Sequence, residues 1–192
     1  MYRSLFLLVV LLFSGPIFAE IEIDEYGSAR TITRSPWQEG NRRVGLGLAA
    51  GGIGGIFAAN FELNFTDRTG LNAGFGVSTD YQSLYLGLKH VLLGTEILPY
   101  VSGGYARWFS NGDEQDVGKT TPGFVGKRFL SEHERKTGVF AENLIYGGLG
   151  IQYLQTHGEW KGSSIYAEVI GIVDLDDLVF EPNAGLGYIH YF

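Results

Sequence analysis

Apolar side chains alternate with polar or small ones in several strand-length segments of this 192-residue chain. In segment 57–65 the apolar face holds Phe57, Ala59, Phe61, Leu63 and Phe65, and the other face holds Ala58, Asn60, Glu62 and Asn64. A period of two residues is that of a β-strand, whose successive side chains point to opposite faces of a sheet. The alternation therefore predicts strands with one apolar and one polar face.

Seven further segments are strand-like, and together with 57–65 they predict eight strands. They are 43–51, 71–78, 84–89, 100–109, 146–154, 165–173 and 179–192. In 43–51 and 146–154 large apolar residues alternate with glycine or other small residues, and in 100–109 the sequence leaves open which residues share a face. The longest apolar stretch, 44–59, contains six glycines, each of which costs a helix about 1 kcal/mol. A membrane-spanning helix is therefore disfavoured. The other architecture that can cross a lipid bilayer is a closed antiparallel sheet, so we expect the eight strands to form a transmembrane barrel.

The first 19 residues have the pattern of a secretory signal peptide. Arg3 supplies a positive charge, residues 5–13 are almost purely apolar, and Gly15-Pro16 precedes a predicted cut ahead of Glu20. The apolar run is shorter than the ~20 residues of a spanning helix. Without this leader the chain carries 13 basic and 21 acidic residues, a balance that argues against nucleic acid as a partner. The absence of cysteine excludes a disulfide-stapled secreted domain.

The spacing of the segments predicts a topology for a barrel over residues 43–192, preceded by a periplasmic segment over 20–42. With a periplasmic start, the short connections 66–69, 93–98 and 155–162 become periplasmic turns, and 51–55, 80–83, 110–138 and 174–178 become extracellular loops. Bacterial barrels favour even strand numbers, short periplasmic turns and longer outer loops. A ten-stranded alternative requires a hairpin within 120–130, where Pro122 interrupts the alternation.

The last predicted strand, 179–192, ends in a pattern of aromatic residues and glycine. Phe192 ends the chain, Tyr188 and His190 share its face, and Gly187 precedes it by five positions. In these residues the chain resembles the small eight-stranded outer-membrane barrels, the class that includes the transmembrane domains of OmpA and OmpX. The resemblance implies a bacterial outer-membrane location and recognition by the barrel-assembly machinery. His190 departs from the class, which usually places an aromatic or large apolar residue there, and the resemblance brings no catalytic residue with it.

The polar faces predict a barrel interior that contains charged side chains. Glu62, Lys89 and Glu168 lie at similar heights on their strands and are expected to form one ion network in the lumen. An eight-stranded barrel is just wide enough for its side chains to fill it, and a desolvated network resists ion passage. The inward set also includes Asn60, Asn64, Tyr85, Gln152 and Tyr166. A plugged lumen is favoured, with a narrow pore as the alternative.

Residues 110–138 form the long loop and the best candidate for contact with a partner. The loop holds five acidic and five basic residues. Basic side chains can contact lipopolysaccharide phosphates and aromatic ones can rest on lipid. The candidate contacts with outer-membrane lipids and lipopolysaccharide are Phe124, Lys127, Arg128, Phe129, Arg135 and Lys136.

No catalytic, metal or cofactor site is assigned from the sequence. Of the four histidines, His133 in the long loop is the one that the topology places near the outer leaflet. Its order relative to Ser131 is opposite to the His-x-Ser order of lipid A deacylases, and Glu132, His133 and Glu134, as chain neighbours, are unsuited to face one metal ion. We therefore expect an outer-membrane barrel with a structural or surface-interaction role. A lipid A-modifying enzyme and a narrow pore are the alternatives.

Overall fold

The computed structural model describes residues 20–23, 29–32, 43–66, 68–111 and 120–192. The chain divides into two compact units after Arg34. The described part of the first unit is an antiparallel pair, β1 (Glu20–Ile23) and β2 (Ala29–Ile32). The predicted leader, residues 1–19, lies outside the described residues. Strand pairing within 20–42 is a feature that the sequence analysis did not predict.

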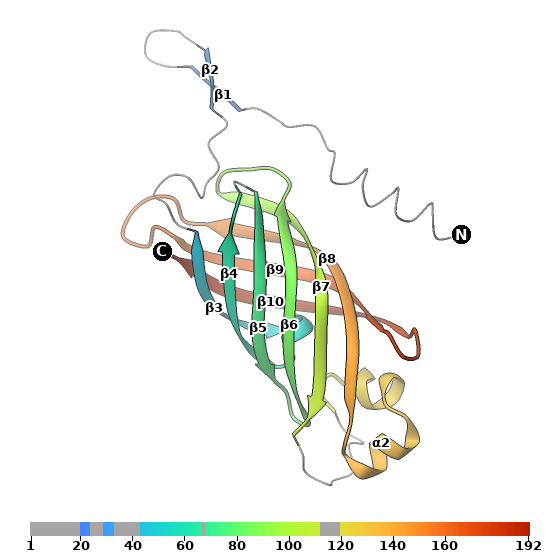
Figure 1. Cartoon of the computed structure of the whole chain (residues 1–192). Helices are drawn as coiled ribbons and strands as arrows, with labels where there is room; N and C mark the ends of the chain where they lie inside the picture. The colour runs from blue at the N-terminus through green and yellow to red at the C-terminus, as the bar shows by residue number, and fades with distance from the viewer. Residues whose placement is uncertain (1–19, 24–28, 33–42, 67, 112–119) are drawn as a thin grey trace, which may run out of the picture. The chain divides into compact units, whose positions relative to one another are not determined.

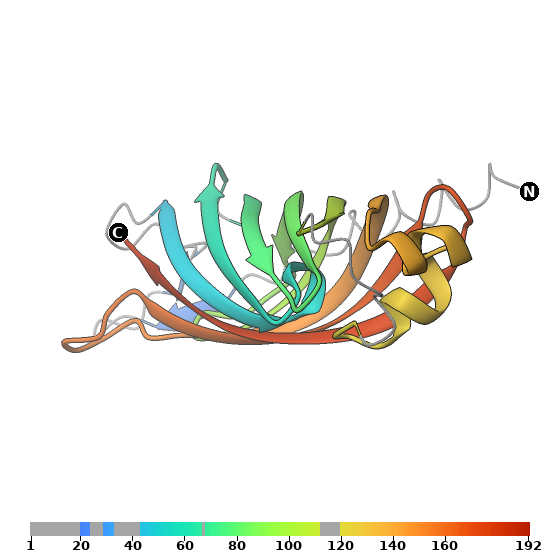
Figure 2. The same cartoon turned by 90° about the horizontal axis from the view of Figure 1, so that it is seen from below.

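The second unit is a closed antiparallel barrel of eight strands (Figures 1 and 2). Each strand pairs with its neighbour in sequence, and β10 closes the ring against β3, with Tyr188 opposite Leu48. The backbone N–H of Phe192 extends this seam by donating to the Val44 carbonyl over 2.8 Å. The predicted all-β barrel of eight strands is therefore confirmed. The strands are β3 (Val44–Gly51), β4 (Phe57–Asn64), β5 (Thr69–Val77), β6 (Tyr81–Val91), β7 (Ile97–Ser110), β8 (Ala141–Leu154), β9 (Ser163–Asp174) and β10 (Phe180–Tyr191).

The antiparallel order gives the barrel two ends of different character. Connections 65–68, 92–96 and 155–162 lie at one end, the short-turn end, and connections 52–56, 78–80, 111–140 and 175–179 lie at the other, the long-loop end. The predicted turns and loops are distributed over the two ends in the same way. Figure 1 shows the helical segment α2 at the long-loop end, between β7 and β8.

Three short helical segments occur among the described residues, all in connections at the long-loop end. They are η1 (Gly52–Gly54), the π-helical η2 (Val125–Phe129) and α2 (Glu132–Thr137). A capping box starts α2: the Glu134 N–H donates to Ser131 Oγ, and the Ser131 N–H donates to Glu134 Oε2 over 2.8 Å. Residues 120–130 thus contain a helical turn rather than two strands, which excludes the ten-stranded alternative. No helix of the described chain has the length and apolar character to cross a membrane.

The barrel exposes large apolar side chains on its outer face, and its interior holds polar and charged side chains together with apolar ones. In β4, Ala58, Asn60, Glu62 and Asn64 point inward and are buried, and the residues between them are exposed. Large exposed apolar residues occur on all eight strands, for example Leu48, Phe61, Phe75, Leu86, Tyr105, Leu149, Val169 and Leu186. A water-soluble barrel would instead turn a polar face outward.

The structure also settles which residues of β7 share a face. Leu98, Tyr100, Ala106 and Trp108 point inward and are at most 2% exposed, and Tyr105 points outward. Aromatic residues lie on both faces of this strand, so hydrophobicity alone does not distinguish inside from outside.

Candidate functional site

The barrel interior is the candidate site, and its centre is an ion pair. Glu62 on β4 and Lys89 on β6 both point inward, and β5 lies between their two strands. The residue of β5 that pairs with Lys89 is Gly70. Lys89 Nζ donates to Glu62 Oε1 over 2.5 Å, and the two residues are 5% and 1% exposed. The Tyr191 hydroxyl donates to the other carboxylate oxygen of Glu62. Both oxygens of this buried carboxylate therefore have a partner.

Glu168 lies in the same interior but does not pair directly with Lys89 among the described contacts. It accepts a hydrogen bond of 3.2 Å from the Tyr100 hydroxyl. Lys89 Nζ lies 4.6 Å from the centre of the same Tyr100 ring, within cation–π range. Glu62 and Lys89 thus form an ion pair, and Tyr100 links this pair to Glu168. The part played by Tyr100 was missed because the sequence left the phase of 100–109 open.

A second group of polar contacts adjoins the ion pair. The Tyr85 hydroxyl donates to the side-chain oxygen of Asn60, and Asn60 Nδ2 donates to the Tyr166 hydroxyl over 2.6 Å. Toward the short-turn end, Gln152 Nε2 donates to the Tyr191 hydroxyl over 2.9 Å and to Ser164 Oγ over 2.6 Å. All eight residues that the sequence predicted to face the lumen do so.

Inward-facing glycines make room for the tyrosine rings. A Cβ atom on Gly74 would lie 2.3 Å from the Tyr85 ring, and one on Gly150 would lie 2.2 Å from the Tyr100 ring. Gly187, a residue of the predicted assembly signal, likewise leaves space for Tyr166. A Cβ atom on Gly187 would lie 2.6 Å from the Tyr166 ring. The alternation of large residues with glycine therefore reflects packing of interior rings.

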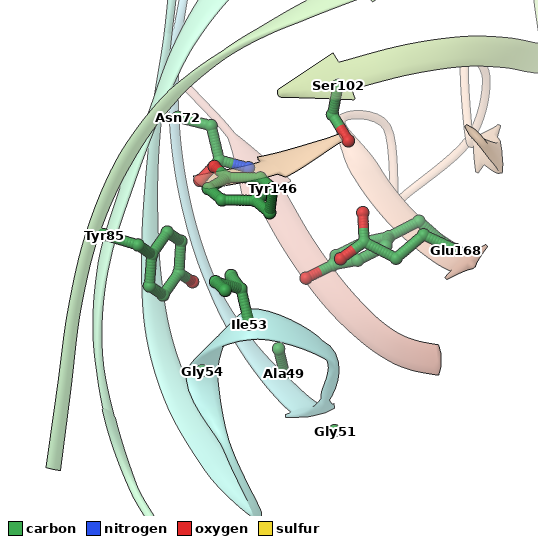
Figure 3. A pocket seen from close by; sticks show the side chains of 10 residues that line it. Ala49, Gly51, Ile53, Gly54, Asn72, Tyr85, Ser102, Tyr146 and Glu168 are labelled. Atoms are coloured by element: carbon green, nitrogen blue, oxygen red, sulfur yellow. The ribbon is translucent and has the colours of Figure 1, made fainter. Parts of the chain in front are cut away.

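A small polar cavity lies between the ion pair and the long-loop end (Figure 3). Glu168, Asn72, Ser102, Tyr85 and Tyr146 are among its lining residues, and its volume is about 20 Å³. Asn72 Oδ1 and Ser102 Oγ are buried there without a hydrogen-bond partner among the described residues. The space fits about one water molecule and is far smaller than a typical small-molecule site.

Aromatic side chains fill the interior at the long-loop end. Segment η1 turns into the barrel (Figure 2), and the Ile53 carbonyl accepts a hydrogen bond of 2.9 Å from Trp108 Nε1. Tyr81 stacks on Trp108 with ring centres 4.7 Å apart, and the Phe129 ring lies 6.1 Å from that of Trp108. Tyr81, Trp108 and Phe129 are each at most 1% exposed. We call this group, together with Phe140, the aromatic cap.

The aromatic cap corrects part of the prediction for the long loop. Phe129 was expected to rest on lipid, but it packs inside the cap, 5.3 Å from the Phe124 ring. Phe124 is half-buried and lies 6.3 Å from the Trp108 ring. The physical reason is η2, whose π-helical turn directs both rings toward the barrel mouth instead of outward.

The four basic candidates of the loop differ in their surroundings. Arg128 pairs with Glu181 on β10, and Lys136 Nζ pairs with Glu132 Oε1 over 2.7 Å across one turn of α2. Lys127 is exposed and forms no ion pair with a described residue. Arg135 is half-buried. Lys127 is therefore the candidate whose charge is most available to an external anion.

The residues of the predicted assembly signal lie at the short-turn end of the barrel. Tyr188 and Phe192 are exposed on the outer face of the barrel, and the His190 ring lies edge-on to Phe192 with centres 4.9 Å apart. His190 Nδ1 lies 3.1 Å from Ser163 Oγ, and the Tyr188 hydroxyl lies 2.9 Å from the same atom. These contacts form a polar edge around the apolar exterior at the short-turn end.

His133, the residue considered for an enzymatic role, is exposed on α2. Its carbonyl accepts a hydrogen bond of 3.0 Å from Thr137 Oγ1. Ser131 Oγ is held by the helix cap, 2.6 Å from Glu134 Oε2. The arrangement of Ser131 is that of a helix N-cap and not of a nucleophile beside a histidine base.

Comparison with known proteins relates the chain to solved barrels by fold. The N-terminal β-barrel domain of Pseudomonas aeruginosa OprF matches with a TM-score of 0.57 and 18% identity, over 79% of this chain and 98% of that one. The outer-membrane protein Ail of Yersinia pestis matches at 11% identity over 79% of this chain and 99% of that one, with a TM-score of 0.40. A scan against family models and a search of curated proteins each give no match. The fold assignment therefore rests on the barrel itself and on its similarity to the OprF domain.

Proposed function

We propose that this protein is a bacterial outer-membrane β-barrel with a closed lumen, and that it has a structural or surface-interaction role. The observation that carries the proposal is the apolar outer wall of the barrel. Outward positions on all eight strands hold large exposed apolar residues, and inward positions hold an ion pair and its hydrogen-bond partners. In water such an exterior far exceeds the apolar patches that soluble proteins expose. In lipid it is the expected surface.

A structural role is favoured over a pore because the interior is occupied along its length. An ion that crosses the barrel has to pass the aromatic cap and then separate Lys89 from Glu62. Breaking a buried ion pair costs about 3–5 kcal/mol. The Tyr191 hydroxyl and the Tyr100 ring already contact the two charges, and Glu168, which also lies in this interior, is already bound by the Tyr100 hydroxyl. This argument supports a plug over a narrow pore.

The proposed orientation places the long-loop end outside the cell. One connection there, 111–140, is far longer than any other and contains α2, and outer-membrane barrels have their longer loops on the outside. Lys127 and, to a smaller extent, Arg135 then offer positive charge to lipopolysaccharide phosphates. The outer face of β10, including Tyr188, and Phe192 beyond its end are offered to the assembly machinery. Loops held on a rigid scaffold commonly carry such contacts.

The test is separation of the membranes of a Gram-negative host that expresses the chain, followed by planar-bilayer recordings of the purified protein. We expect the protein in the outer-membrane fraction and no discrete conductance steps. Stepwise conductance in the unchanged protein would support the pore instead. Recovery in the soluble fraction in folded form would contradict the membrane location. Lipid A mass spectra of the same cells should be unchanged by expression, and an altered mass would favour the enzyme.

A further inference from the structure

Three carboxylates converge at the long-loop end of the barrel. Glu142 is the second residue of β8, Asp174 is the last residue of β9, and Asp176 lies in the turn that follows. The β8–β9 ladder pairs Leu144 with Asp174, and Glu142 shares the inward face of Leu144. One oxygen atom from each carboxylate lies within 4.8 Å of the other two.

Two of these carboxylates are buried without the partners that buried charges need. Asp174 is fully buried: its Oδ1 accepts a hydrogen bond of 2.9 Å from the Asp176 N–H, and its Oδ2 has no hydrogen-bond partner among the described residues. Glu142 is 4% exposed, and within the described chain its side chain forms no hydrogen bond or ion pair. A buried charge in this state is costly unless a counter-charge binds it.

The surroundings of Glu142 increase the need for a cation. The side-chain charges that act on it are those of Asp174, Glu134, Asp176 and Asp177, all acidic. Leu144 and Phe140, which flank it in sequence, belong to the buried apolar core of this end. Low polarity nearby strengthens each repulsion. The group therefore differs from acidic side chains on an open surface, which water and salt screen.

We propose that Glu142, Asp174 and Asp176 bind a divalent cation of the calcium class. The three carboxylate oxygens lie within 4.8 Å of one another, close enough to share one ion. Calcium accepts flexible sets of oxygen ligands, whereas magnesium demands a near-ideal octahedron and dehydrates reluctantly. Backbone carbonyls or water complete the six to eight oxygen ligands that calcium takes. The binding site does not depend on the proposed role in the membrane.

Cation binding at this position ties two strands to the turn that follows them. The Leu175 N–H already donates to the Asn143 carbonyl over 2.9 Å, which holds the turn against β8. A cation shared by Glu142, Asp174 and Asp176 adds a second link at the same place. We therefore expect calcium to stabilise the long-loop end.

Terbium, a luminescent substitute for calcium, tests the site in the full chain folded in detergent micelles. Trp108 stands opposite Glu142 in the β7–β8 ladder and serves as the light-absorbing donor. We expect sensitised terbium luminescence that calcium removes by competition, with a dissociation constant for calcium of about 0.1–1 mM, as in extracellular calcium sites. Asp174→Asn and Glu142→Gln should each weaken binding by at least about tenfold, since changes even outside the ligand shell cost that much.

The control is Asp177→Asn, which removes an exposed acidic group from the same turn. Its affinity should stay within about twofold of the unchanged protein, because an exposed charge is screened. In EDTA, Asp174→Asn and Glu142→Gln should be at least as stable as the unchanged protein, because an unpaired buried charge has been removed. If either variant fails to fold, the exposed Asp176→Asn gives the same comparison. Absence of calcium-competed luminescence, or binding that none of the three substitutions weakens, would overturn the proposal.

Discussion

Lys89 and Glu62 form an ion pair of 2.5 Å inside a barrel whose outer wall is apolar. The two residues come from strands separated by β5, and each is at most 5% exposed. Neither charge can return to water without opening the barrel. The pair is therefore a structural element of the barrel interior.

Replacement of Lys89 by methionine removes one partner and leaves the Glu62 carboxylate buried with the Tyr191 hydroxyl alone. We expect the free energy of unfolding to fall by about 3–5 kcal/mol, measured by urea titration in detergent or lipid vesicles. The double variant Glu62→Gln, Lys89→Met removes both charges of the pair and leaves Glu168 with its hydrogen bond from Tyr100, so it should recover most of the loss. Equal stability of Lys89→Met and the unchanged protein would argue against a tightly coupled pair.

Two glycines of β8 offer a matched comparison of interior packing. At Gly150 an added Cβ atom would meet the Tyr100 ring at 2.2 Å, whereas at Gly147, on the outer face, the nearest atom would be 3.8 Å away. Gly150→Ala should destabilise the barrel by about 1–3 kcal/mol through overpacking. Gly147→Ala should have less effect in the same urea titration. Equal effects would show that Tyr100 does not fill the space beside Gly150.

Two lysines of the long loop differ in how free their charges are. Lys127 has no ion pair within the described chain, whereas Lys136 is paired with Glu132 over 2.7 Å. In co-sedimentation with lipopolysaccharide-containing vesicles, Lys127→Gln should therefore weaken binding more than Lys136→Gln. Vesicles of neutral phospholipid should show no difference between the two variants. A larger effect at Lys136 would place the lipopolysaccharide contact elsewhere on the loop.

Phe192 is expected to act during assembly more than in the finished sheet. Its ring is exposed on the outer face, and its backbone N–H makes one hydrogen bond to Val44 across the seam. Deletion of Phe192 should lower the yield of protein in the outer membrane, while refolding of the same variant in detergent stays close to normal. Phe192→Tyr keeps the aromatic ring and should assemble well. Equal losses in cells and in detergent would indicate a purely structural contribution.

The strands and their faces could be predicted because a period of two residues is a local property of the sequence. Glu62, Lys89 and Glu168 were assigned to the interior in this way. Phe129 was misplaced because its direction depends on the π-helical turn of η2, which has no simple pattern in the sequence. Glu142 and Asp174 were missed because they come together only through the register of the β8–β9 ladder. In the sequence, each of the two strands has a single acidic residue near the end concerned, which gives no sign of a cluster.

The most direct test of the account asks what surrounds the outer wall of the barrel. The chain contains no cysteine, so single cysteines can be introduced at Leu48, Leu86 and Leu149 on three separate strands and labelled with a nitroxide in reconstituted vesicles. All three positions should be accessible to oxygen, which dissolves in lipid, and protected from a water-soluble nickel complex. Lys127→Cys, in the exposed loop, should show the opposite pattern. Free access of the nickel complex to Leu48, Leu86 and Leu149 would contradict a barrel whose outer wall faces lipid.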